Sequence, residues 1–225
     1  DTLLYVEALK VDLTRFDRES NFLALDEVTL VHPYYNLYIP EGDSVTNMQF
    51  LIDVFKTDTP DTNRVKFGIA CDNLMLDGLR FDYNDNRVEP LGGNRVDFRH
   101  LAVRSLSGRI SDIEIGDSIM ASIHGLHLAE QSGFRVRCLN SNVVFATDRV
   151  ECKDLQVVAN LSVLEGSYSM YFDDFQSFKS FFTDVRLEAS LSKARIHYYD
   201  VGFFSESVRN MLTPMQFKGR ASGTL

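Results

Sequence analysis

Tryptophan is absent from this chain of 225 residues, and cysteine occurs only three times. Cys71, Cys138 and Cys152 include no Cys-x-x-Cys pair, so we expect neither a zinc site nor a redox pair. Three cysteines are also too few for a disulfide framework. Cys71 and Cys152 fit small core residues, and a Cys138–Cys152 bond between neighbouring strands is the alternative in an oxidising compartment.

Long apolar runs are missing as well. No stretch approaches the roughly 18 residues that a membrane-spanning helix needs, and no signal peptide opens the chain. The sequence starts at Asp1, already inside a strand pattern, and residues 222–225 end in another. We therefore expect a piece of a longer protein, with any membrane anchor or export signal outside it.

Positive charge is in short supply, because 23 Lys and Arg residues face 32 Asp and Glu residues, giving a net charge of -9. Nucleic-acid binding needs a basic stripe that neutralises phosphates, so this balance argues against it. The balance also gives no support for electrostatic docking on anionic lipid.

Catalytic signatures are absent too: the sequence has no nucleophile elbow, no His-Glu-x-x-His helix and no phosphate-binding glycine loop. His124 and His127 are favoured as solvent-facing strand residues over a metal pair. Asp173 and Asp174 fit the first turn of a helix better than an acid–base pair. The glycosylation sequon at residues 160–162 is treated as a chance match. We predict no enzyme, no catalytic residue, no cofactor and no metal site.

What the chain does contain is a repeated apolar pattern, Φ-x-Φ-x-x-Leu-x-Φ, in which Φ is apolar. Ile69-Cys71-Leu74-Leu76 is one copy. The outer pairs follow the strand period of two, whereas the middle pair is three apart. A bulge or bend can absorb that slip and keep all four side chains on one face. Further copies occupy residues 4–11, 96–103, 121–128 and 150–157, with looser ones at 23–30 and 134–141.

Repeated bent strands predict a curved sheet with one continuous apolar face. This face is either a closed core or an open groove, and the pattern alone does not separate the two. Its predicted members are Val6, Leu9, Val11, Leu74, Leu76, Phe98, Leu101, Val103, Ile123, Leu126, Leu128, Val136, Leu139, Leu155 and Val157.

Two amphipathic helices are predicted, over residues 44–56 and 173–185, and a short helical segment over 203–212. Ser44 or Asp43 can cap the first helix. Each helix either packs on the sheet as a lid or lines a lipid-sized groove. Their apolar stripes are Met48, Leu51, Ile52 and Phe55 in the first, and Phe175, Phe178, Phe181 and Phe182 in the second.

The chain divides into three segments by pattern: strands plus helix and polar linker (1–63), repeated strands (64–172), and a helix with returning strands (173–225). A break in the strand ladder is expected at His32-Pro33, since proline lacks an N–H donor. The predicted fold class is mainly β: a curved antiparallel sheet, β-groove or solenoid of bent strands, with two or three accessory helices.

Several phrases of the sequence resemble a known family. They include residues 1–11, His32-Pro-Tyr-Tyr-Asn-Leu-Tyr, Gly42-Asp-Ser-Val-Thr-Asn-Met-Gln-Phe and Gly166-Ser-Tyr-Ser-Met-Tyr-Phe. In this order they are similar to the N-terminal periplasmic part of TamB-like proteins, the AsmA-related translocation and assembly module family, in its Bacteroidetes form. The likeness runs through nearly the whole chain.

The resemblance implies a β-groove protein that is anchored in the inner membrane of a Gram-negative bacterium and crosses the periplasm. It implies outer-membrane biogenesis without catalysis. The implied roles are a phospholipid conduit whose groove receives acyl chains, or a scaffold that assists translocation and assembly of outer-membrane proteins. An outer-membrane barrel partner would bind outside this segment. A carbohydrate-active β-solenoid enzyme is the remaining alternative, and it would need paired carboxylates in a cleft.

Overall fold

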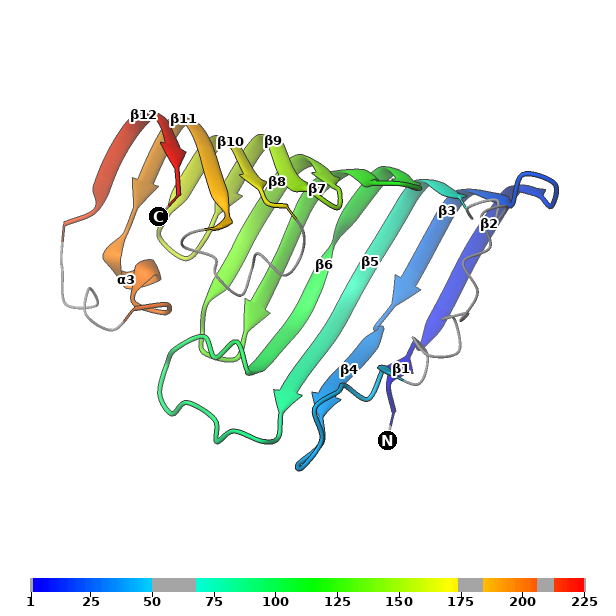
Figure 1. Cartoon of the computed structure of the whole chain (residues 1–225), viewed down its shortest axis with the longest axis horizontal. Coiled ribbons are helices and arrows are strands. Elements are labelled where there is room, and N and C mark those ends of the chain that lie inside the picture. The colour runs from blue at the N-terminus through cyan, green and yellow to red at the C-terminus, as the bar shows by residue number, and fades with distance from the viewer. Residues whose placement is uncertain (1, 50–67, 174–183, 206–212, 225) are drawn as a thin grey trace.

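The computed structural model describes residues 2–49, 68–173, 184–205 and 213–224, and these form a mainly β protein built on one twelve-stranded sheet (Figure 1). The elements are β1 (Leu4–Tyr5), β2 (Ala8–Asp17), β3 (Phe22–Val31), β4 (Tyr34–Ile39), β5 (Gly68–Asp85), β6 (His100–Ile115), β7 (Ile119–Glu130), β8 (Arg135–Phe145), β9 (Arg149–Val158), β10 (Val163–Tyr171), β11 (Arg186–Ile196), α3 (Tyr198–Val201) and β12 (Met215–Gly223).

The predicted fold class, a mainly β protein with a curved sheet that forms a groove, is confirmed; the sheet is mixed rather than antiparallel throughout. From β5 to β12 the strands form an antiparallel meander. Before it, β3 and β4 both pair with β5 in parallel, one after the other along its length. The predicted break at His32-Pro33 is confirmed, because it separates β3 from β4. Outside them, β2 pairs with β3 and β1 with β4.

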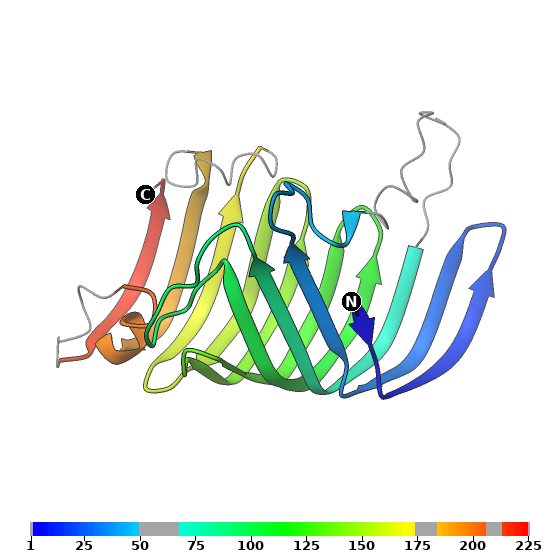
Figure 2. The same ribbon diagram turned by 90° about the horizontal axis from the view of Figure 1, so that it is seen from below.

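The sheet curves without closing on itself, so the strands form the wall of an open trough (Figure 2). The accessible surface is 14450 Å², whereas a compact monomer of this mass exposes roughly 10,000 Å². Among the described residues only Val185 is fully buried. The described residues therefore form a single curved layer rather than a layer packed around a closed core.

Matched slips in neighbouring strands produce the bend. Cys71 pairs with Ile113 and Leu74 with Ile110 in one unbroken register, although the two members in each strand are three residues apart. Asp112 lies between Ile110 and Ile113 with φ of 52°, a left-handed conformation that is rare for a residue with a side chain. Because both strands slip at the same level, their apolar side chains stay on the same face through the bend.

Glycine permits the closest approach between strands at two points. A Cβ on Gly166 (φ 154°) would lie 2.2 Å from the carbonyl oxygen of Ser190, and a Cβ on Gly108 would lie 2.7 Å from the Cα of Leu126. Both neighbours are backbone atoms, which cannot swing aside as a side-chain end can. These two glycines hold β10 against β11 and β6 against β7 at the level of the bend.

The described residues correct several helix and strand boundaries. Residues 44–48 form bends and turns, in which Asp43 Oδ1 accepts the N–H of Ser44 at 2.7 Å. Most of the two predicted amphipathic helices, including Leu51, Ile52, Phe55, Phe175, Phe178, Phe181 and Phe182, lies outside the described residues. Helix α3 precedes the short helix expected at 203–212, whose described residues 203–205 are not helical, and residues 206–212 are not described. Two predicted returning strands are one bulged strand, β11.

The alternative of a Cys138–Cys152 bond is wrong. Cys138 pairs with Val158, whereas Cys152 pairs with Val143, so the two cysteines are far apart along β8 and β9. All three cysteines are free thiols. Cys71 is buried and Cys152 partly so, and burial raises the pKa of both thiols.

Replacing Gly166 with alanine should destabilise the protein by about 2–3 kcal/mol, because the new methyl group overpacks against a rigid carbonyl. Gly92→Ala is the matched control, since a Cβ added there would have no neighbouring atom within 4 Å. Urea unfolding followed by circular dichroism measures both. Equal midpoints for the two variants would contradict the close approach of β10 and β11.

Candidate functional site: the apolar face of the sheet

The inner face of the trough carries rows of apolar side chains that run across the strands. Cross-strand pairing joins one residue from each of nine successive strands, and each is apolar. This first row is Phe16, Leu23, Ile69, Ile115, Ile119, Phe145, Val150, Met170 and Leu187. With neighbouring strands about 4.8 Å apart, the row is about 40 Å long.

A second row crosses the sheet on the other side of the bend, and it contains many of the residues predicted from the repeat. It consists of Leu9, Leu30, Leu76, Gly108, Leu126, Leu139, Val157, Leu164, Ala194 and Phe217. Between the two rows, Val11, Val28, Leu74, Ile110 and Ile123 form a shorter one. Further predicted members pair as Leu128 with Val136, Leu101 with Tyr83 and Leu155 with Gly166.

Near the N-terminal end of the sheet this face deepens into a cavity of about 540 Å³. Its volume lies within the range of small-molecule sites, and all its lining residues are apolar or aromatic. Val6, Leu9 and Val103 of the predicted face lie here together. The full lining is Leu4, Val6, Leu9, Leu30, Pro33, Tyr35, Leu79, Phe81, Val103 and Leu106.

Sequence reasoning missed part of this cavity. Leu79 and Phe81 follow a second slip, at Gly78 (φ 68°), and Leu106 follows another at Ser105 (φ 55°). The signal was present, since Leu76 and Leu79 are three apart just as Cys71 and Leu74 are. The predicted repeat contains one slip in each strand, whereas the two longest strands contain two.

Phe98 and Met48 differ from the other predicted residues. Phe98 does not lie on the inner face: it belongs to the loop between β5 and β6 and is 69% exposed. Met48 is the described member of the first predicted helix stripe, and its sulfur accepts the Tyr35 hydroxyl at 2.7 Å. Because Tyr35 lines the cavity, Met48 lies beside the cavity wall.

The inner face is open to solvent at the edge strand β2. Leu9 is 60% exposed, Val11 50% and Phe16 59%. Each buried methylene group of an apolar ligand gains about 0.8 kcal/mol, so a face of this kind favours long hydrocarbon chains.

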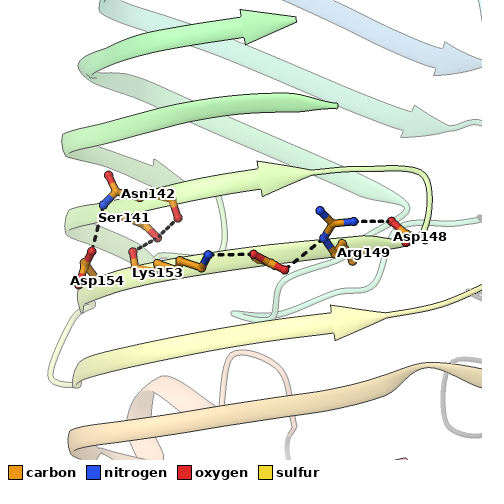
Figure 3. Close-up of polar contacts among 7 residues, drawn as sticks. Ser141, Asn142, Asp148, Arg149, Lys153 and Asp154 are labelled. Carbon is orange, nitrogen blue, oxygen red and sulfur yellow. Dashed lines mark hydrogen bonds and ion pairs between the residues drawn. The ribbon is translucent and has the colours of Figure 1, made fainter. Parts of the chain in front are cut away.

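The outer face is polar. Figure 3 shows part of it on β8 and β9, where Asn142 donates to Asp154 at 3.0 Å. Next to this pair, Glu151 accepts from Arg149 at 3.1 Å and lies 3.3 Å from Lys153. Ion pairs on an exposed surface stabilise little. These charged side chains make the outer face hydrophilic, in contrast to the apolar inner face.

Buried carboxylates organise one rim of the trough. Asp85 accepts two hydrogen bonds from the Arg87 guanidinium, at 2.7 and 2.9 Å, and this pairing lowers the pKa of Asp85 to about 2. Burial works to raise the pKa of Asp97, but amide hydrogen bonds from Leu91 and Arg99 and the His100 ring outweigh it, so the pKa is lowered. Both carboxylates hold loop backbone and are not available as acid–base groups.

The other polar candidates are also structural. His124 Nε2 bonds the Ser111 hydroxyl at 2.8 Å, whereas His127 Nδ1 contacts the Gly125 carbonyl at 3.2 Å, so the two rings have separate partners. No group of three metal-ligating side chains gathers within the described ranges. In the sequon, the Asn160 amide donates to the Gly133 carbonyl at 3.2 Å.

Comparisons of the chain with models of protein families, with curated proteins and with solved structures give no match. Within the part of the chain that the structure describes, no helix is both long and apolar enough to cross a membrane.

The Asp85–Arg87 pair makes stability depend on pH. The folded pKa of Asp85 lies below its ordinary value of 3.8, so the pair stabilises the protein above about pH 4, and this contribution is lost as pH falls toward 2. Arg87→Met should therefore lower the melting temperature at neutral pH, with a difference from wild type that shrinks between pH 4 and pH 2. A difference independent of pH would contradict this assignment.

Proposed function

We propose that this chain is a periplasmic segment of an inner-membrane-anchored, TamB/AsmA-like envelope biogenesis protein whose inner face carries lipid acyl chains. The cargo is phospholipid, which moves between the inner and outer membranes. The protein acts without catalysis. Its anchor, and the contact with an outer-membrane barrel, lie in regions outside this chain.

One observation supports the proposal above the others: the first apolar row is continuous across nine strands of the sheet. A hydrocarbon chain that moves along the first row meets an apolar side chain at every strand from Phe16 to Leu187. An interrupted row would present a barrier at each polar position, because apolar contact is lost there. The cavity beside Leu9 adds a deeper apolar site at one end of the path.

Phospholipid should copurify with the chain expressed in Gram-negative bacteria, and native mass spectrometry should detect it as a mass increment. Leu9→Asp combined with Val11→Asp should remove at least about nine-tenths of the bound lipid, because two carboxylates then face the apolar path and carry a high desolvation cost. Both side chains are at least half exposed on an edge strand, so the fold should tolerate the changes.

Met75→Asp is the matched control, since Met75 is an exposed apolar residue at 39% on the outer face, where it alternates with Leu74 and Leu76. It should keep its lipid. The proposal fails if the wild-type chain binds no lipid, or if the inner-face and outer-face variants bind equal amounts.

A scaffold that assists assembly of outer-membrane proteins is the second candidate. It is favoured by the two ends of the sheet, because β2 and β12 each pair on one side only among the described strands. An added strand from a client protein could extend the sheet there. However, Lys10, Asp12 and Arg15 on β2 and two cations on β12 are the charges that proteins place on edges to discourage such pairing. We therefore place lipid handling ahead of this role.

A further inference from the structure

One rim of the trough differs from the other in its chemistry. Because the meander is antiparallel, the segments 86–99, 131–134, 159–162 and 197–205 all lie along the same rim, which we call the loop rim. The hairpin tips at 18–21, 116–118 and 146–148 lie along the opposite rim, the hairpin rim. Figures 1 and 2 show α3 beside the loop between β5 and β6.

Hydrogen bonds join these loops into one surface. The Val96 amide donates to the Phe203 carbonyl at 2.9 Å, so the β5–β6 loop is held against the segment after α3. The Leu161 amide donates to Asp200 at 2.9 Å, which ties the β9–β10 turn to α3. Phe134 from the β7–β8 turn packs edge-on against Phe203, with ring centroids 5.8 Å apart. The loop rim is thus preorganised.

Large apolar side chains project from this surface into solvent. Phe98 is 69% exposed, although its ring stacks on Phe204 at 6.3 Å, and Phe204 is itself 51% exposed. Leu91 and Leu161 are at least half exposed on neighbouring loops, and Tyr199 nearly so. They lie on loops that are bonded to one another, and we call them together the rim patch. A patch of this kind marks an interaction site in a soluble protein.

The charges around the patch are mainly positive despite the acidic chain. Four carboxylates of the loop rim are buried and accept backbone amides: Asp85, Asp97, Glu130 and Asp200. The exposed cations of the rim are Arg99, Arg135, Arg137 and Arg195, whereas Arg87 is paired with Asp85. The exposed acids are Glu89 and, after β4 at the far end of the rim, Glu41 and Asp43. At the hairpin rim, the tips carry Glu19, Asp117 and Asp148 beside the exposed cations Arg18 and Arg186.

We infer that the loop rim docks on the surface of a bilayer that contains anionic phospholipid. Phe98, Leu91 and Leu161 insert at the level of the head groups, and Tyr199 suits the same depth because it has an apolar ring with a polar tip. The arginines contact lipid phosphates, which a guanidinium binds through paired hydrogen bonds. The acidic hairpin rim is repelled, so the contact also fixes which rim of the trough faces the membrane. This docking does not depend on lipid transport along the inner face.

Vesicle flotation tests the inference with the whole chain. We expect flotation with vesicles of phosphatidylglycerol mixed with phosphatidylcholine, and at least about tenfold weaker partitioning on phosphatidylcholine alone. Arg99→Glu combined with Arg135→Glu should cost at least about tenfold on the anionic vesicles, since each cation contributes about 1 kcal/mol. Phe98→Asp combined with Leu91→Asp should abolish flotation on both.

Two controls carry the same chemistry elsewhere on the protein: Met75→Asp on the outer face and Arg18→Glu at the hairpin rim. Both should float as wild type does, and circular dichroism should show every variant folded. The inference is overturned if wild type does not float or if the double variant at Phe98 and Leu91 floats normally. It is also overturned if sedimentation detects a dimer of the wild-type chain that this double variant no longer forms, because the patch would then be a dimer interface. It is also overturned if Leu9→Asp with Val11→Asp abolishes flotation while the rim variants do not, because the inner face would then be the membrane-binding surface.

Discussion

The structure depends on one constraint: every strand must bend and still keep its apolar residues on one face. Side chains alternate with a period of two, so a slip in one strand alone would turn the rest of that strand over relative to its neighbour. The pairs Cys71–Ile113 and Leu74–Ile110 show the solution, because both strands slip at the same level and the register between them is preserved. The slips are matched in β3, β5 and β6, whereas between β6, β7 and β8 register shifts at the bend bring the apolar residues back into line.

The repeat made the strands, the bend and most of the inner face predictable, since all three are recorded in spacings of two and three residues within a strand. The parallel placement of β3 and β4 on β5 was not predictable in this way. It is a choice of partner between strands, and spacing within one strand does not encode it. Phe98 fits the repeat by spacing alone, yet the chain reaches β6 only at His100. A pattern cannot say where a loop ends when loop residues continue the apolar alternation.

Charge was the least predictable property. The net charge of -9 gave no support for electrostatic docking on anionic lipid, and a uniformly charged surface would give none. Folding distributes the charge unevenly, however. Asp97, Glu130 and Asp200 turn inward, where backbone amides compensate the free energy of burying their charge, and the arginines beside them stay exposed. The loops determine which carboxylates are buried, because their backbone amides need acceptors. The net charge of the sequence does not contain that information.

A sheet with one apolar face ordinarily buries it against a second layer. Over the inner face, the described residues leave Leu9, Val11 and Phe16 at least half exposed. Such a face costs free energy in water unless something apolar occupies it. The ligand that best fits must be long, because the rows are long, and must tolerate solvent along one side, because the trough does not close. A lipid meets both conditions, since its acyl chains can lie along the rows while its head group remains in water. The apolar and cationic loop rim has the complementary chemistry for the surface from which such a molecule would come.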